Sequence, residues 1–97
     1  KLVAGDLVLN PGEHTVLSKG RRVQLTLKEY ELLKLFMENI GMAFTRDLLM
    51  TKIWGSDFVG ETRTVDVHIG TLRTKLGPCG EYIETVRGVG YRMEVHA

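Results

Sequence analysis

The chain has 97 residues, of which 43% are apolar and 26% charged, with 13 basic and 12 acidic side chains and a formal net charge of +1. This length fits one domain spanning residues 1–97, the composition is that of a globular protein, and no apolar run reaches the roughly 18 residues of a membrane-spanning helix. The single cysteine, Cys79, excludes an internal disulfide, and without an N-terminal signal segment it predicts a cytoplasmic protein.

The first quarter of the chain alternates short apolar runs with turn-forming residues. Residues 7–9 are followed by Asn10, Pro11 and Gly12, and residues 15–17 are followed by a second turn that ends at Gly20. Proline fixes φ and glycine accepts positive φ, so these segments are typical of turns. The pattern predicts three or four short antiparallel strands over about residues 2–25.

Three helices are expected over about residues 27–76. Apolar residues recur from Leu27 at three- and four-residue spacing, and Thr26 and Glu29 have the spacing of a capping box. This first helix should end at Gly41, a second should run from Thr45 to Gly55, and a third from about residue 61 to residue 76, where glycine and proline follow.

The C-terminal segment has the pattern of a β-hairpin over about residues 82–95. Two strand-like runs, 82–87 and 91–95, flank the tight connection Gly88-Val89-Gly90. A small sheet, three helices and a terminal two-stranded ribbon form an α+β architecture, the winged helix-turn-helix.

The third helix has two contrasting faces. At 100° per residue one narrow sector holds the core-forming side chains Val65, Ile69, Leu72 and Leu76. The opposite face holds Arg63, Thr64, Val67, Gly70, Thr71 and Thr74, flanked by His68 and Arg73. Small hydroxyl and methyl groups suit close approach to the DNA major groove, where the flanking cations would hold phosphates. A merely solvated helix face explains this one helix equally well.

The C-terminal hairpin favours the DNA-binding hypothesis over a merely solvated helix. Thr85, Arg87, Tyr91 and Arg92 cluster around its turn, and Arg87 at the tip is placed to enter a minor groove. Solubilising arginines are the ordinary alternative, but a hairpin directly after a candidate recognition helix favours a wing.

Four segments carry a resemblance to a known family: 25–33 (LTLKEYELL), 53–55 (IWG), 63–69 (RTVDVHI) and 85–92 (TVRGVGYR). In this order and spacing they resemble the winged-helix effector domain of OmpR/PhoB-type response regulators. The resemblance implies a four-stranded N-terminal sheet, binding of double-stranded promoter DNA and control of transcription. It also implies pairing with a second copy, head-to-tail on direct repeats, and control by a receiver domain that this chain does not contain.

The resemblance also implies roles for individual residues. Phosphate contacts fall on Trp54, Arg63, His68, Arg73, Thr85 and Tyr91. Val67 corresponds to a contact with a thymine methyl group, and Arg87 to the minor-groove residue of the wing. To these base contacts the exposed face of the third helix adds Gly70, Thr71 and Thr74. A loop that touches RNA polymerase in several relatives corresponds to Gly55, Ser56, Asp57, Phe58, Val59 and Gly60. The chain departs from better-known members at Gly70 and Thr71, where those often carry basic residues.

Two other classes of function are alternatives to the DNA-binding hypothesis. A winged helix that binds only a protein partner fits the near-neutral charge, although five basic residues lie near the proposed DNA side: Arg63, Arg73, Lys75, Arg87 and Arg92. An enzyme is disfavoured because the three histidines are far apart and none has metal-ligand spacing with Cys79, which we expect to be an inert surface thiol in a loop. We expect no catalytic residue, metal or cofactor.

Overall fold

The computed structural model describes residues 1–55 and 60–95. It begins with a four-stranded antiparallel sheet in the order β1-β2-β3-β4, as the resemblance implies. The strands are β1 (Leu2–Ala4), β2 (Leu7–Asn10), β3 (Thr15–Ser18) and β4 (Arg21–Arg22). Alternate residues of β2 and β3, Leu7, Leu9 and Val16 among them, are buried on one face of the sheet, and this face packs on the first helix.

The first two helices are capped as their sequences predict. In α1 (Leu27–Glu38) the Thr26 hydroxyl accepts the Glu29 backbone N–H at 3.3 Å, and the Glu29 carboxylate accepts the Thr26 N–H at 2.8 Å, which completes the capping box. In α2 (Arg46–Trp54) the Thr45 hydroxyl accepts the backbone N–H of Leu48. The helix α1 ends before Gly41, at residue 38.

The third helix, α3 (Arg63–Leu76), presents the predicted face to the core. Its side chains Val65, Ile69, Leu72 and Leu76 are all at most 1% exposed. The helix starts two residues after the predicted position, and its N-cap residue, Thr62, makes no side-chain hydrogen bond to it.

The predicted C-terminal hairpin is confirmed, and a third strand that the sequence did not predict joins its sheet. The short strand β5 (Ala43–Thr45) pairs with β7 (Gly90–Met93), which pairs in turn with β6 (Ile83–Val86). A Cβ on Gly90 would lie 2.0 Å from the backbone oxygen of Phe44, so glycine permits this close approach. The segment Ala43–Thr45 is too short to show the alternating pattern that predicts a strand, and its partner β7 lies more than 40 residues away in the sequence.

The expectation that Cys79 is a surface thiol in a loop was also wrong. Residues Gly77–Tyr82 form a 3₁₀ helix, η1, and Cys79 within it is 1% exposed. The turn packs so closely on α3 that a Cβ on Gly80 would lie 2.3 Å from the backbone oxygen of Arg73. Cys79 therefore belongs to the hydrophobic core.

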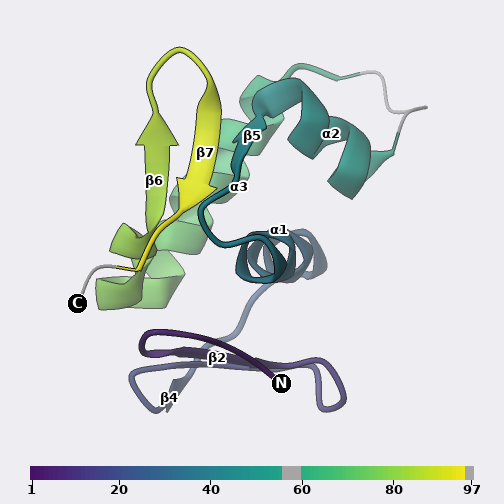
Figure 1. Ribbon diagram of the computed structural model, residues 1–97. Coiled ribbons are helices and arrows are strands. Elements are labelled where there is room, and N and C mark those ends of the chain that lie inside the picture. The colour runs from purple at the N-terminus through teal and green to yellow at the C-terminus, as the bar shows by residue number, and fades with distance from the viewer. Residues whose placement is uncertain (56–59, 96–97) are drawn as a thin grey trace.

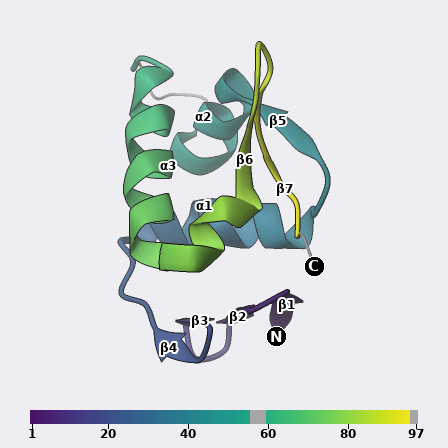
Figure 2. The ribbon, with the colours of Figure 1, turned by 90° about the vertical axis from the view of Figure 1, so that its left-hand side faces the viewer.

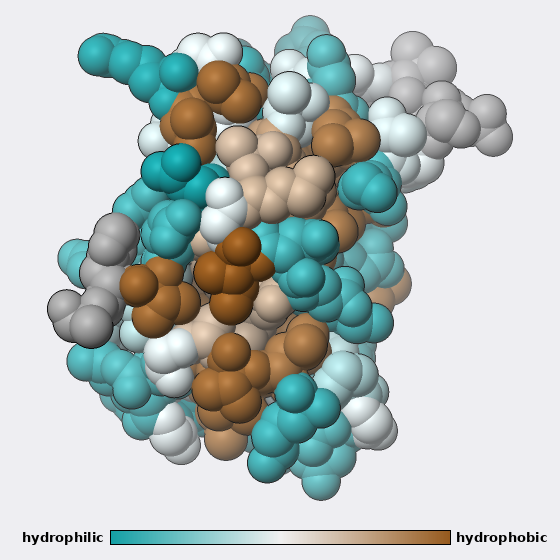
Figure 3. Space-filling model, in the orientation of Figure 1, coloured by the Kyte–Doolittle hydropathy of each residue, from teal (hydrophilic) through white to brown (hydrophobic). Residues whose placement is uncertain are grey.

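The two sheets lie at opposite ends of the molecule with α1 between them, and α2 and α3 lie beside the C-terminal sheet (Figure 1). The N-terminal sheet lies under α1, and α3 stands beside the β6–β7 hairpin, whose tip projects from the body (Figure 2). The face turned away from α3 carries apolar side chains in separate groups among polar ones (Figure 3). No helix in the described parts of the chain is long and apolar enough to cross a membrane.

Candidate nucleic-acid interface

The outer face of α3 is open to solvent. Val67 is 57% exposed, and Arg63, Gly70, Thr71 and Thr74 are exposed beside it. A Cβ on Gly70 would meet no heavy atom within 4 Å. The residues predicted to read bases on this helix therefore lie together on one surface of small side chains.

One side of this face is held by α1 and α2. We call the contacts of Glu29, Thr71, Lys75, Trp54 and His68 the helix-side flank. The Glu29 carboxylate is almost fully buried and accepts the Lys75 ammonium at 2.7 Å on Oε1, which also accepts the Thr26 N–H. Its other oxygen, Oε2, accepts the Thr71 hydroxyl at 2.6 Å. One carboxylate thus ties the cap of α1 to two side chains of α3.

The electrostatics of Glu29 follow from these bonds. Burial by itself raises the pKa of the carboxyl, but hydrogen bonds from Lys75, Thr71 and Thr26 outweigh it and lower the pKa from 4.5 to about 2. Glu29 is therefore ionised at neutral pH.

The aromatic part of the helix-side flank joins α2 to α3. The rings of Trp54 and His68 meet edge-on with centroids 4.9 Å apart. The Nδ1 atom of His68 lies 2.8 Å from the backbone oxygen of Thr64, so this nitrogen carries the hydrogen and Nε2 is the one left for a ligand. Lys28 donates to the Ile53 carbonyl at 2.9 Å, close to the end of α2. Trp54 and His68, two of the predicted phosphate-binding residues, are therefore in direct contact.

The other side of α3 is held by the hairpin and by the start of α2. We call the contacts of Arg73, Thr85, Tyr91, Asp66 and Arg46 the hairpin-side flank. Arg73 donates to the Ile83 carbonyl at 2.9 Å and to the Thr85 hydroxyl at 3.0 Å, and its guanidinium carbon lies 5.4 Å from the centre of the Tyr91 ring. Three predicted phosphate-binding residues, Arg73, Thr85 and Tyr91, are thus brought together where α3 meets the hairpin.

Asp66 is the acidic centre of this flank. It accepts the Tyr91 hydroxyl at 2.5 Å and forms an ion pair with Arg46 at the start of α2. Burial raises the pKa of Tyr91, and the bond to Asp66 raises it further, so the phenol remains protonated and donating. The aspartate therefore links α3 to both α2 and β7.

Much of the basic charge assigned to the DNA side is paired within the protein. Lys75 is bound to Glu29, and Arg92 lies 3.0 Å from Glu84 and 3.7 Å from Glu94. In contrast, Arg63 and Arg87 are exposed and make no ion pair with the described residues. These two are the cations most available to a ligand.

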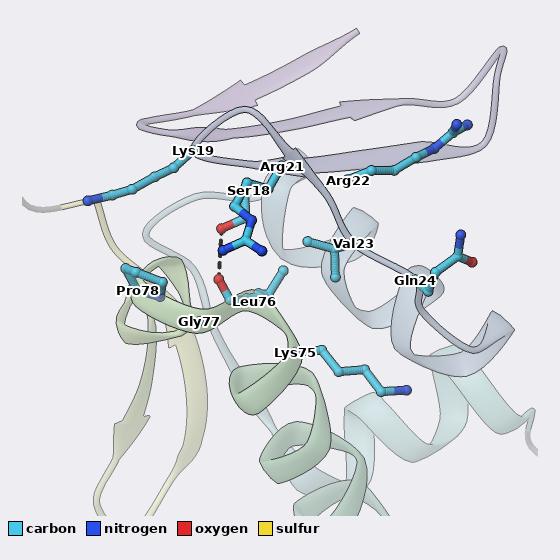
Figure 4. A pocket seen from close by; sticks show the side chains of 10 residues that line it. All are labelled: Ser18, Lys19, Arg21, Arg22, Val23, Gln24, Lys75, Leu76, Gly77 and Pro78. Carbon is cyan, nitrogen blue, oxygen red and sulfur yellow. Dashed lines mark hydrogen bonds between the residues drawn. The ribbon is translucent and has the colours of Figure 1, made fainter.

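A basic cleft of about 540 Å³ lies apart from the outer face of α3, at its C-terminal end. Figure 4 shows it between the β3–β4 turn and the start of η1, where the Ser18 hydroxyl donates to the Leu76 carbonyl at 2.7 Å. Lys19, Arg21, Arg22 and Lys75 line it. The sequence pattern does not predict this cleft, because its residues come together only when the N-terminal sheet packs near the end of α3.

The remaining predicted residues lie partly outside the described chain. Ser56, Asp57, Phe58 and Val59 of the predicted polymerase-contact loop fall outside the described residues, whereas Gly55 and Gly60 are exposed at its two ends. Sequence reasoning missed the roles of Asp66 and Arg46, and it saw Glu29 only as a cap. In the described parts of the chain, no three His, Cys, Asp or Glu side chains are placed to hold a metal ion.

Residues 20–93 match the family described as transcriptional regulatory protein, C terminal. The chain belongs to this family. The transcriptional regulatory protein PhoP of alkaline phosphatase synthesis in Bacillus subtilis is 42% identical over 97 residues. That match covers 97% of this chain and 40% of PhoP, so the chain spans about two fifths of this relative.

Solved structures support the same assignment. The Klebsiella pneumoniae RstA DNA-binding domain, solved in complex with the RstA box, has a TM-score of 0.85 at 32% identity and covers 98% of this chain and 97% of that one. DrrB of Thermotoga maritima, an OmpR/PhoB homologue, has a TM-score of 0.83 at 35% identity, over 92% of this chain and 42% of DrrB. The resemblance to OmpR/PhoB-type regulators and the winged helix-turn-helix fold are confirmed. Transcriptional regulation, the role that PhoP's name gives, is not an enzymatic one.

Proposed function

We propose that this domain binds double-stranded promoter DNA and regulates transcription as the output domain of a two-component response regulator. In this proposal α3 lies in the major groove and the tip of the β6–β7 hairpin lies in a minor groove. The observation that carries it is the outer face of α3, which is exposed, small and fixed on both sides. The DNA complex of the similar RstA domain supports it.

The exposed residues divide into base contacts and phosphate contacts. Val67 offers methyl groups to thymine, while Thr71 and Thr74 offer hydroxyls and methyls, and Gly70 allows the helix backbone to approach the base edges. Arg87 at the hairpin tip suits the negative potential of a narrow minor groove.

The phosphate contacts lie on both sides of this face. Arg63, His68 and Trp54 are placed at the α2 end of α3. Arg73 has five N–H donors, so its two bonds to the hairpin leave donors for a phosphate. We infer that Thr85 and Tyr91 also support phosphate binding indirectly, because they hold Arg73 and the hairpin in place.

The partners of the domain follow from its family. We propose that a second copy binds head-to-tail on direct repeats, that residues 55–60 contact RNA polymerase, and that a receiver domain in the rest of the protein controls pairing. The protein would act in the cytoplasm, with no cofactor and no catalytic residue.

The decisive test is selection of a binding site from a random DNA library, followed by affinity measurements at two salt concentrations. We expect an enriched direct repeat whose affinity falls steeply with salt, because phosphate contacts release counterions. Arg63→Ala should weaken binding to all sequences by a similar factor and reduce the salt slope by about 1. Lys34→Ala, on α1 and outside both flanks, is the matched control and should leave the slope unchanged. A domain that enriches no sequence and shows no salt-dependent binding would instead support the alternative, a winged helix that binds only a protein.

A further inference from the structure

Glu29 bears on the chemistry of Thr71 as well as on the position of α3. We propose that Glu29 holds the only hydroxyl hydrogen of Thr71 inside the protein, so that Thr71 accepts hydrogen bonds from DNA bases and does not donate them. The inference rests on the proposed function, because it concerns how the outer face of α3 reads the major groove.

The direction of the hydrogen bond between Thr71 and Glu29 is fixed by charge. The pKa of Glu29 lies near 2, so its carboxylate is ionised at neutral pH and can only accept. The Thr71 hydroxyl, whose Oγ1 atom is 2.6 Å from Oε2, must therefore be the donor. The second acceptor within reach is the backbone oxygen of His68 at 3.1 Å, which also belongs to the protein. In either arrangement the hydrogen is turned away from DNA.

The carboxylate cannot turn to release Thr71, because its other oxygen is already bound from two sides. Oε1 accepts the Thr26 N–H at 2.8 Å and the Lys75 ammonium at 2.7 Å. Both groups are donors, and neither offers a lone pair. These two donors require an acceptor at Oε1 and leave Oε2 facing Thr71.

An acceptor-only Thr71 has a defined preference in the major groove. There the hydrogen-bond donors are the exocyclic amines of adenine and cytosine, whereas guanine N7 and O6 and thymine O4 are acceptors. A lone pair on Thr71 therefore favours an amine-bearing base at the contacted position. It cannot serve the acceptors of guanine or the O4 of thymine.

Thr74 on the same face provides an internal comparison. Its hydroxyl donates to the Gly70 carbonyl at 3.1 Å, a bond within the helix that Thr side chains often make. Within residues 1–55 and 60–95 no carboxylate holds it, so Thr74 can turn its hydrogen toward DNA at low cost. Glu29 thus acts on one of the two threonines.

Glu29→Gln is the variant that tests the mechanism. The amide oxygen should stay with the two donors, Thr26 N–H and Lys75, which leaves the amide NH₂ facing Thr71 and reverses their hydrogen bond. The Thr71 hydrogen would then have only the His68 carbonyl as a protein acceptor, and Thr71 could turn it from there toward DNA at low cost, as Thr74 can from the Gly70 carbonyl. In library selection we expect the base preference at one position to move from adenine or cytosine toward guanine or thymine, by about three- to tenfold in relative affinity.

Two variants at position 71 provide the controls. Thr71→Ser keeps the hydroxyl and should keep the wild-type preference for an amine-bearing base, whereas Thr71→Val keeps the shape and should lose that preference. In the Thr71→Val background, Glu29→Gln should cause no further change in base preference. Circular dichroism and thermal melting show whether each variant is folded, and if Glu29→Gln is not, the position 71 pair decides.

The outcomes are distinct. Selection of the same bases by the wild type and a folded Glu29→Gln variant would overturn the inference, as would an amine preference that survives Thr71→Val or is lost in Thr71→Ser. A wild-type domain that selects no sequence at all would instead overturn the proposed function.

Discussion

The two flanks of α3 hold the same helix by different means. On the helix-side flank, one buried carboxylate collects three donors, two of which come from α3 itself. On the hairpin-side flank, Arg73 and Asp66 of α3 reach out to β6, β7 and α2. The first flank therefore sets the hydrogen-bonding state of the outer face, and the second sets the position of the hairpin relative to that face.

The flanks also differ in their exposure to solvent. The Glu29 side chain is 3% exposed, whereas the side chains of Arg46 and Asp66 are 45% and 34% exposed. Ion pairs of exposed groups contribute little, about 0–1 kcal/mol, so the hairpin-side flank depends more on backbone pairing and on the buried ring of Tyr91. Its weakest point under mutation is the close approach of β7 to β5.

Separating β7 from β5 should have the largest effect on the stability of the fold. We expect Gly90→Ala to lower the free energy of unfolding by about 3 kcal/mol, since the new Cβ would overlap the Phe44 oxygen and separate β5 from β7. Urea denaturation measures the change. Gly70→Ala is the matched control: it adds the same methyl in open space on α3 and should raise stability by about 1 kcal/mol. Equal losses in the two variants would show that β5 is not held as described.

The contribution of the helix-side flank to the free energy of unfolding should be lost in acid. The pKa of Glu29 is about 2 in the folded protein and 4.5 ordinarily, so its contribution is complete above pH 4.5 and is lost as the pH falls through 2. A shift of this size corresponds to about 3 kcal/mol. Unfolding free energies measured between pH 7 and pH 2 should fall less steeply for Glu29→Gln than for the wild type. Glu38→Gln, exposed at the end of the same helix, should retain the wild-type slope, and a Glu29→Gln profile parallel to wild type would contradict the assignment.

A smaller effect is expected from Tyr91→Phe, which removes one bond to Asp66 and leaves the Arg46 pair in place. We expect a loss of about 1–2 kcal/mol at pH 7, because this part-buried hydrogen bond has a charged acceptor. Because folding raises the pKa of Tyr91, the wild type should also lose stability as the pH rises above 10, where the unfolded chain ionises first. Thermal melting at pH 7 and at pH 10–11 checks both parts, and an alkaline loss that persists in Tyr91→Phe would place its origin elsewhere.

The sequence predicted the parts of this fold that depend on local pattern. The capping box of Thr26 and Glu29 and the four core residues of α3 were correct, because both depend on spacing within one helix. The strand at Ala43–Thr45 and the burial of Cys79 were missed. Each depends on contact with an element elsewhere in the chain: the strand pairs with β7, and the turn that carries the cysteine packs on α3. The periodicity of a single sequence shows local structure and does not show which separate elements come into contact.

The same division runs through the candidate site. Sequence alone determined which residues of α3 face outward, since helical geometry fixes the direction of each side chain. Only the tertiary structure decided which polar groups on that helix remain available to a ligand. Glu29 binds Lys75 and the hydroxyl hydrogen of Thr71, which lie 46 and 42 positions away, and β6 takes up two of the five N–H donors of Arg73. The physical reason is that a buried charge must be paired, and packing between separate elements brings its partners within reach.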